Sequence, residues 1–191
     1  MFEIISPDQY KVLPWKNGKG ETIELAINNG GTLENFDWRL SIANVIEDGE
    51  FSDFSGYNRN LVLIKGQGIT LQHDELLYDR LEQQLSVATF DGGLRTQASL
   101  ISGPITDFNL MTKSNTYHGS IDTFPVQQET ILKAGHLCFI YGLDEDIKIA
   151  SRTEPFVQIV PAGHLIKISD QNTTKLTVSG KNMIIVYLTH I

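Results

Sequence analysis

The chain has 191 residues, of which 41% are hydrophobic and 20% charged, as in a folded globular protein. This length allows one large domain or two small ones, and the composition excludes a disordered chain. The net charge of -8 argues against binding to duplex nucleic acid, which requires a basic surface.

The sequence also indicates a cellular location. It shows no basic segment followed by an apolar one at its start, and no apolar run long enough to span a membrane. We therefore expect a cytoplasmic protein that binds no membrane. The single cysteine, Cys138, lies in an apolar run and cannot form an internal disulfide, so we expect a buried thiol.

Short apolar or alternating runs, separated by turn residues about every ten positions, predict an all-β chain that folds as a sandwich or barrel. The predicted strands, in chain order, cover residues 22–28, 37–46, 59–65, 68–72, 76–82, 96–101, 106–111, 130–133, 136–142, 145–150, 156–160, 163–169, 174–178 and 182–189. Glycine-containing turns separate many of them, such as Asn29-Gly30-Gly31, Lys65-Gly66-Gln67-Gly68 and Ser179-Gly180.

Residues 71–85 leave two alternatives open. Leu77, Leu81 and Leu85 have helical spacing, but a strand hairpin fits the segment equally well. Residues 112–125 are polar and contain a proline, so we place the joint between two β units there. The expected domains are residues 1–112, with a ligand pocket, and residues 113–191, which could share strands with the first.

Polar side chains alternate with apolar ones along several predicted strands. Arg39 and Ser41 alternate with Trp38, Leu40 and Ile42, and Glu24 opposes Ile23, Leu25 and Ile27. Asp107 and Asn109 share one face of a later strand, and Arg59 begins another. These faces could simply meet water, as in an ordinary amphipathic sheet. Inside a small barrel, however, they would converge on a pocket.

The residue types suggest what such a pocket would bind. Arg39 and Arg59 would supply planar donors for carboxylates, and Glu24 would balance an arginine. Asp107 and Asn109 would suit an amide or imine N–H.

Metal and nucleophile chemistry find little support in the sequence. There is no His-x-His pair, and the five histidines are scattered; only His136 and His164, which follow glycine turns, remain candidate ligands. Ser41 has no neighbouring histidine to activate it. We expect no metal and no cofactor.

Residues 14–24, PWKNGKGETIE, lack the spacing of a phosphate-binding loop, and no helix pattern follows them. They are predicted to form a glycine-rich approach to the first barrel strand. Lys16 and Asn17 would lie at the pocket mouth, and Lys19 would point to solvent.

A series of motifs completes the pattern. In order, they are Pro14-Trp15-Lys16-Asn17-Gly18, Thr22, Glu24, Phe36-Asp37-Trp38-Arg39-Leu40-Ser41-Ile42-Ala43, Gly49, Phe51-Ser52, Phe54, Gly56, Arg59, Phe90-Asp91-Gly92, Gly103-Pro104 and Asp107-Phe108-Asn109-Leu110-Met111. In order and spacing they resemble the HutD/Ves family, over residues 10–112. Two departures are Lys19, where relatives commonly have glycine, and Thr112-Lys113-Ser114, where a basic pair is common.

The resemblance implies a bicupin, in which one chain forms two cupin-like β-barrels of the jelly-roll type without the usual metal-binding histidines. It also implies a regulatory role in histidine utilisation through an intermediate such as formylglutamate, or, for the Ves branch, a role in stress and cold response. No enzymatic reaction is established for the family.

We therefore expect binding of a small anionic metabolite, most plausibly an N-acylated glutamate, by a sensor or buffer. An enzyme acting on a similar amide, with Glu24 or Asp107 as general base, is the alternative, and a metal-dependent dioxygenase is a third. A homodimer is left open. Trp15 would wall the pocket, and the predicted ligand-binding residues are Lys16, Asn17, Glu24, Trp38, Arg39, Ser41, Arg59, Asp107 and Asn109.

Overall fold

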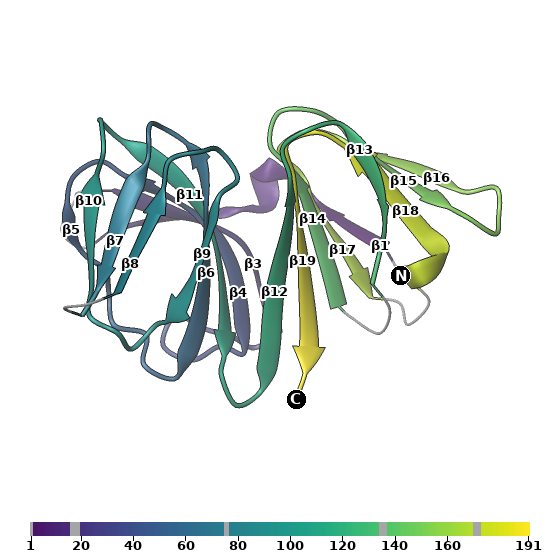
Figure 1. Cartoon of the computed structure of the whole chain (residues 1–191). Coiled ribbons are helices and arrows are strands. Elements are labelled where there is room, and N and C mark those ends of the chain that lie inside the picture. The colour runs from purple at the N-terminus through teal and green to yellow at the C-terminus, as the bar shows by residue number, and fades with distance from the viewer. Residues whose placement is uncertain (1, 16–19, 75–76, 134–136, 170–172) are drawn as a thin grey trace. The chain divides into compact units, whose positions relative to one another are not determined.

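The computed structural model describes residues 2–15, 20–74, 77–133, 137–169 and 173–191 (Figure 1). The chain divides into two compact units. The first unit comprises Tyr10–His118 and Ile191, and the second comprises Gly119–His190 and Met1–Gln9. Apart from short 3-10 helices at Pro7–Gln9 and Thr173–Lys175, the regular structure of the described residues is β-strand, which confirms the all-β prediction.

The first unit contains two antiparallel sheets. The six-stranded sheet has the order β2 (Lys11–Pro14), β3 (Glu21–Ile27), β4 (Trp38–Val45), β11 (Ile105–Lys113), β6 (Tyr57–Lys65) and β9 (Val87–Asp91). The four-stranded sheet has the order β5 (Gly49–Glu50), β10 (Thr96–Leu100), β7 (Ile69–His73) and β8 (Leu77–Leu81). Both sheets contribute to one apolar core, formed by Val45, Leu61, Leu63, Ile69, Leu71, Leu81, Ala88, Phe90, Ala98 and Ile105.

The local sequence explains how the chain passes between these sheets. Strand β6 ends in four consecutive buried apolar residues, 61–64, so both of its faces are covered. Gly66 and Gly68 then take positive φ angles of 105° and 123°, which L-residues rarely adopt. A side chain at Gly68 would also lie 2.6 Å from the Leu81 carbonyl oxygen. The chain can therefore turn sharply from β6 into β7 of the other sheet.

The second unit repeats this architecture. Its five-stranded sheet has the order β1 (Phe2–Ile5), β17 (Leu165–Ser169), β14 (Leu137–Gly142), β19 (Met183–His190) and β12 (Tyr117–Phe124). Its four-stranded sheet has the order β13 (Gln128–Ile131), β18 (Leu176–Gly180), β15 (Ile147–Ser151) and β16 (Val157–Val160). The core between them is almost entirely aliphatic and contains Cys138, so the prediction of a buried thiol is confirmed.

Residues 71–85 form a hairpin rather than a helix, because β7 and β8 pair in antiparallel register from Ile69–Leu81 to His73–Leu77. Five strands were not predicted: β1, β2, β5, β9 and β12. The first four have only two to five residues each. Strand β12 lies in the polar segment that was predicted to be a joint, and most of its side chains are half-buried.

The division of the chain also differs from the sequence-based one at residues 1–9. Those residues were placed with the first domain, but β1 pairs with β17, from Phe2–Ile168 to Ile5–Leu165, and so completes the second unit. Along the chain, the units meet between His118 and Gly119 rather than between residues 112 and 113. Within the described residues there is no helix of the length and apolarity needed to cross a membrane.

Candidate functional site

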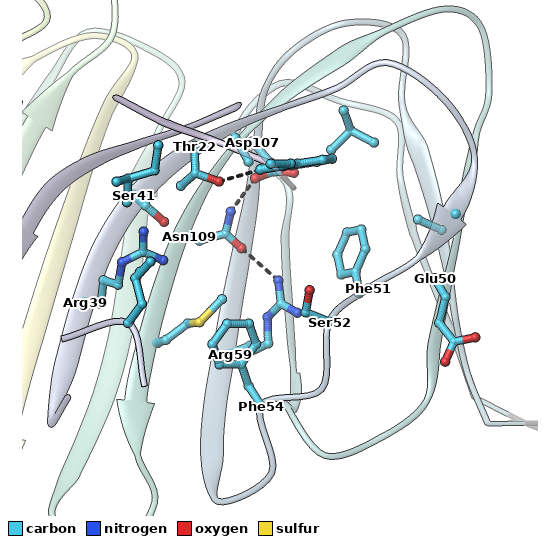
Figure 2. Close-up of a pocket in the computed structure, with 18 of the residues that line it drawn as sticks. Thr22, Arg39, Ser41, Glu50, Phe51, Ser52, Phe54, Arg59, Asp107 and Asn109 are labelled. Atoms are coloured by element: carbon cyan, nitrogen blue, oxygen red, sulfur yellow. Dashed lines mark hydrogen bonds between the residues drawn. The ribbon is translucent and has the colours of Figure 1, made fainter. Parts of the chain in front are cut away.

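The first unit contains a cavity of about 610 Å³, a size typical of small-molecule sites (Figure 2). One wall is the inner face of strands β3, β4, β11 and β6. The other is formed by residues 47–54, which follow β4, and by residues 13–15, which precede β3. Five of the predicted site residues line this cavity: Arg39, Ser41, Arg59, Asp107 and Asn109.

Strand register explains why these five side chains meet. In the antiparallel ladder, Met111 of β11 lies opposite both Arg39 of β4 and Arg59 of β6. Asn109 lies opposite Ser41, two positions along. Paired residues point to the same side of a sheet, so all of these side chains face the cavity. The two arginines are separated by two strand spacings, or about 10 Å between their α-carbons.

Glu24 holds Arg39 in place. The Nε of Arg39 donates a hydrogen bond of 2.8 Å to Oε2 of Glu24, and both side chains are buried. The amine of Lys11 lies 3.7 Å from Oε1 of Glu24, at the exposed edge of the sheet. Among the described residues, the two terminal nitrogens of Arg39 make no hydrogen bond. Arg39 is thus oriented through Nε, and its planar end remains available to a ligand.

A β-bulge brings Glu24 to this position. The register of β3 against β4 shifts between Glu24 and Ala26, so that Glu24 lies opposite Ser41 and Ile27 lies opposite Arg39. The predicted simple alternation, with Ile27 on the apolar face, is therefore wrong beyond Glu24. Glu24 does not line the cavity itself and acts on it through Arg39.

Three phenylalanine rings surround the guanidinium group of Arg59. Its guanidinium carbon is 4.9 Å from the ring centre of Phe51, 5.2 Å from that of Phe90 and 5.7 Å from that of Phe54. Its Nη2 donates a hydrogen bond of 3.4 Å to Oδ1 of Asn109, while its buried Nε has no hydrogen-bond partner among the described residues. Burial lowers the pKa of Arg59 to about 10, partly offset by Asp107, so the side chain stays cationic at neutral pH.

Asp107 is the most deeply buried carboxylate of the site, with 1% of its surface exposed. Nδ2 of Asn109 donates a hydrogen bond to its Oδ1, so Asn109 links Asp107 to Arg59 (Figure 2). Burial raises the pKa of Asp107 to about 7, although Arg59 and the hydrogen bond from Asn109 favour the ionised form. Near neutral pH, Asp107 can therefore accept or release a proton.

Apolar and acidic groups complete the wall. The indole Nε1 of Trp15 donates a 2.8 Å hydrogen bond to Oγ1 of Thr22, which fixes the ring beside the cavity. Phe51 and Phe54 were not predicted as site residues, although both belong to the motif series. The rim carries three carboxylates that were also not predicted: Glu47, Asp48 and Glu50.

Like Glu24, Trp38 was predicted to bind the ligand and does not line the cavity. It is 5% exposed and lies on the face of β4 opposite to Arg39 and Ser41, because neighbouring strand residues point in opposite directions. Lys16 and Asn17 lie outside the described residues, as do Lys19 and His136. No described group of three or more His, Cys, Asp or Glu side chains is arranged to hold a metal ion.

Two facing β-sheets define a cupin-type barrel, and the chain contains two such units, of which the first encloses the polar cavity. The chain belongs to the HutD family, whose model matches residues 7–186. An uncharacterized 21.2 kDa protein in the hutC 3' region of Pseudomonas putida is 34% identical over 122 residues, 64% of each chain. Protein Ves of Escherichia fergusonii is 37% identical over 103 residues, 53% of each chain.

Solved structures agree with this assignment. HutD from Pseudomonas fluorescens SBW25 is similar with a TM-score of 0.82 and 28% identity over 100% of both chains. A conserved protein of unknown function from Pseudomonas aeruginosa PAO1 gives 0.83 and 25% over 98% of both chains. A bacterial pirin from Escherichia coli shares the fold alone, with a TM-score of 0.60 and 7% identity over 98% of both chains. The predicted bicupin fold class and family resemblance are confirmed.

Proposed function

We propose that this protein binds a small anionic metabolite with two carboxylates in the cavity of its first unit. The observation that carries the proposal is the pair of buried arginines, Arg39 and Arg59, on one face of the sheet and two strands apart. Arginine is suited to carboxylates because its planar nitrogens match both carboxylate oxygens. A ligand with an acid group at each end would engage both side chains.

The polar groups beside the arginines suggest the middle of the ligand. Ser41 and Asn109 form a polar row next to the arginines, and both line the cavity. An N-acylated glutamate such as N-formylglutamate has two carboxylates and an amide, and therefore matches acidic ends with a polar centre. The relative encoded in the hutC 3' region supports a ligand from histidine degradation.

We assign the protein a sensor or buffering role in the cytoplasm, in histidine utilisation or in a stress response. In this role, the ligand is held by side chains and is not transformed. The charge of the site suits reversible binding, because Glu24 neutralises Arg39 and leaves Arg59 as the cation that the ligand compensates. A fully paired site would gain less from an anion.

Isothermal titration calorimetry with N-formylglutamate, formiminoglutamate and urocanate tests the proposal. We expect one of the two glutamate derivatives to bind, and binding to be lost in Arg39→Ala and Arg59→Ala. Arg80→Ala is the matched control, because Arg80 lies on β8, is exposed and pairs with the exposed Glu82 just after that strand. If the unaltered protein binds none of the three compounds, the proposed ligand class is wrong.

One observation favours a second candidate, a hydrolase or isomerase acting on a similar amide. The pKa of Asp107 is raised to about 7 inside a cavity, which suits a general base near neutral pH. Incubation of the same compounds with the pure protein, followed by mass spectrometry, separates the two functions. A new product that disappears in Asp107→Asn would establish the enzyme, and unchanged compounds would exclude it for these substrates.

A further inference from the structure

We propose that the cavity takes up its anionic ligand together with one proton, which resides on Oδ2 of Asp107 and is donated in a hydrogen bond to a ligand oxygen. This inference rests on the proposed function and deepens it. It requires a ligand that presents an acceptor oxygen, such as an acyl oxygen, at the Asp107 end of the cavity.

Among the described residues, Asp107 has no direct cationic partner in the sheet. Its neighbours in register are Ala43 on β4 and Leu63 on β6, both of which are apolar. Arg59 lies opposite Met111, four residues further along β11, or about 13 Å between α-carbons. Among the described residues, no ion pair joins Asp107 to a base, and Asn109 bridges it to Arg59.

The hydrogen bonds also determine which oxygen of Asp107 takes the proton. Arg59 can only donate, so it must meet the amide oxygen of Asn109. The amide nitrogen is thereby directed at Oδ1 of Asp107, which must accept. Oδ2 has no hydrogen-bond partner among the described residues, and Asp107 lines the cavity. A proton on Oδ2 would therefore be offered to the ligand.

The other charged groups around the cavity strengthen the coupling. Arg39 on β4 is paired with Glu24 on β3, and Lys11 on β2 is exposed at that pair. Among the described residues, Arg59 on β6 is the other buried cation of the cavity, while Glu47, Asp48 and Glu50 lie at the rim, where Glu50 pairs with Arg95. His73 on β7, paired with Asp79 on β8, lies behind the ring of Phe90 and does not line the cavity.

An anion that enters the cavity adds negative charge beside Asp107 and the carboxylates of the rim. Near a group as buried as Asp107 the effective dielectric constant is low, so two like charges repel strongly, and a proton on Asp107 removes the repulsion. Burial already raises the pKa of Asp107 to about 7, so the proton is acquired at little cost near neutral pH. Above that pH, each ligand should bring one proton with it, and the affinity should fall about tenfold per pH unit.

Calorimetric titration with N-formyl-L-glutamate at pH 6.5, 7.5 and 8.5 tests this coupling. Each pH is repeated in two buffers with different ionisation enthalpies, which yields the number of protons taken up. We expect close to one proton per ligand at pH 8.5, and a Kd roughly 20-fold higher there than at pH 6.5, given a pKa of about 7. In Asp107→Asn, that ratio should fall toward one, because a carboxamide remains neutral at every pH.

Glu82→Gln is the matched control, because it removes an exposed carboxylate that does not line the cavity and should keep the 20-fold dependence. Binding without proton uptake at pH 8.5, or an unchanged ratio in Asp107→Asn, would overturn this inference and leave the proposed function standing. Loss of binding by Asp107→Asn at every pH would also overturn it, since an ionised acceptor would then be required. If the unaltered protein bound N-formyl-L-glutamate at no pH, that ligand would be excluded, and absence of formiminoglutamate binding as well would refute the proposed function itself.

Discussion

Glu24 and Arg39 are joined across the β3–β4 pair by a 2.8 Å hydrogen bond between buried side chains. Removing one partner of such a pair leaves an uncompensated buried charge, which costs about 3 to 5 kcal/mol. We therefore expect Glu24→Ala to lower the free energy of unfolding by about 3 kcal/mol, measured by urea denaturation. The double variant Glu24→Met/Arg39→Met should recover most of this loss, because it buries no charge.

Lys11→Ala is the control for that prediction. Lys11 also contacts Glu24, at 3.7 Å, but its side chain is 70% exposed. Exposed ion pairs contribute less than about 1 kcal/mol, so the unfolding curve should barely move. Equal losses in Lys11→Ala and Glu24→Ala would mean that burial of the Glu24–Arg39 pair does not determine its contribution.

Arg59 should be the residue most sensitive to a conservative change. Arg59→Lys keeps the charge but loses the planar donor that faces Asn109 and the contacts with three phenylalanine rings. We expect the Kd for N-formylglutamate to rise at least about tenfold in Arg59→Lys and about 100-fold in Arg59→Met, by calorimetry. Circular dichroism confirms folding of each variant. Wild-type affinity in Arg59→Met would show that Arg59 does not bind the ligand.

The two tryptophans offer a fluorescence test of the site, since Trp15 lines the cavity and Trp38 lies on the opposite face of β4. A ligand that enters the cavity should change the emission of Trp15. This change should persist in Trp38→Phe and disappear in Trp15→Phe. The reverse result would show that the ligand binds on the other face of the sheet.

The thiol of Cys138 should be unreactive in the folded protein. It is fully buried in the core of the second unit, and burial raises the pKa of the thiol well above its usual range. We expect no labelling by iodoacetamide at pH 8 in native buffer and complete labelling in guanidinium chloride, measured by intact-protein mass. Rapid native labelling would mean that this core opens easily.

Asp107 makes stability depend on pH in a defined direction. Its pKa rises from 3.8 to about 7 on folding, so the native state binds the extra proton between these values. The corresponding stability is complete below pH 4 and is lost as the pH rises through about 7. One pKa unit corresponds to about 1.4 kcal/mol, so a shift from 3.8 to about 7 corresponds to roughly 4 to 5 kcal/mol.

Asp107→Asn removes this titration. Its melting temperature should therefore exceed that of the unaltered protein at pH 8.5, and the difference should shrink at pH 5, by differential scanning calorimetry. Glu50→Gln provides the comparison, because it removes a carboxylate from an exposed position at the rim. If the difference in melting temperature between Asp107→Asn and the unaltered protein did not change with pH, Asp107 would not be a buried carboxyl that binds a proton on folding.

Strand alternation made much of the site predictable. Arg39, Ser41, Asp107 and Asn109 were selected because each alternates with apolar residues, and the paired register of β4 and β11 places all four on one face. The same rule excludes Trp38, which precedes Arg39 and must point the other way. Its aromatic character, rather than its position, had suggested a ligand contact. The role of all these residues in binding remains a prediction.

Other features leave no periodic signal in a sequence. The bulge after Glu24 changes which residues of β3 face the cavity, and it is determined by pairing with β4 rather than by local composition. Phe51 and Phe54 lie in an irregular segment, where the sequence does not indicate the direction of a side chain. Strand β12 is mostly polar, and its segment was predicted to be the joint between two units. Its pairing with β19 depends on residues distant in sequence, so no local pattern indicates it.

The pairing of β1 with β17 has a consequence for dissecting the chain. A single cut near His118 would separate residues 119–191 from the strand that completes their five-stranded sheet. The backbone of β17 would then be open to pairing with other molecules, and the fragment should aggregate. A fragment of residues 10–118 would keep every described residue of the cavity wall. The two units are therefore interleaved in sequence, because the N-terminal strand completes the sheet of the C-terminal unit.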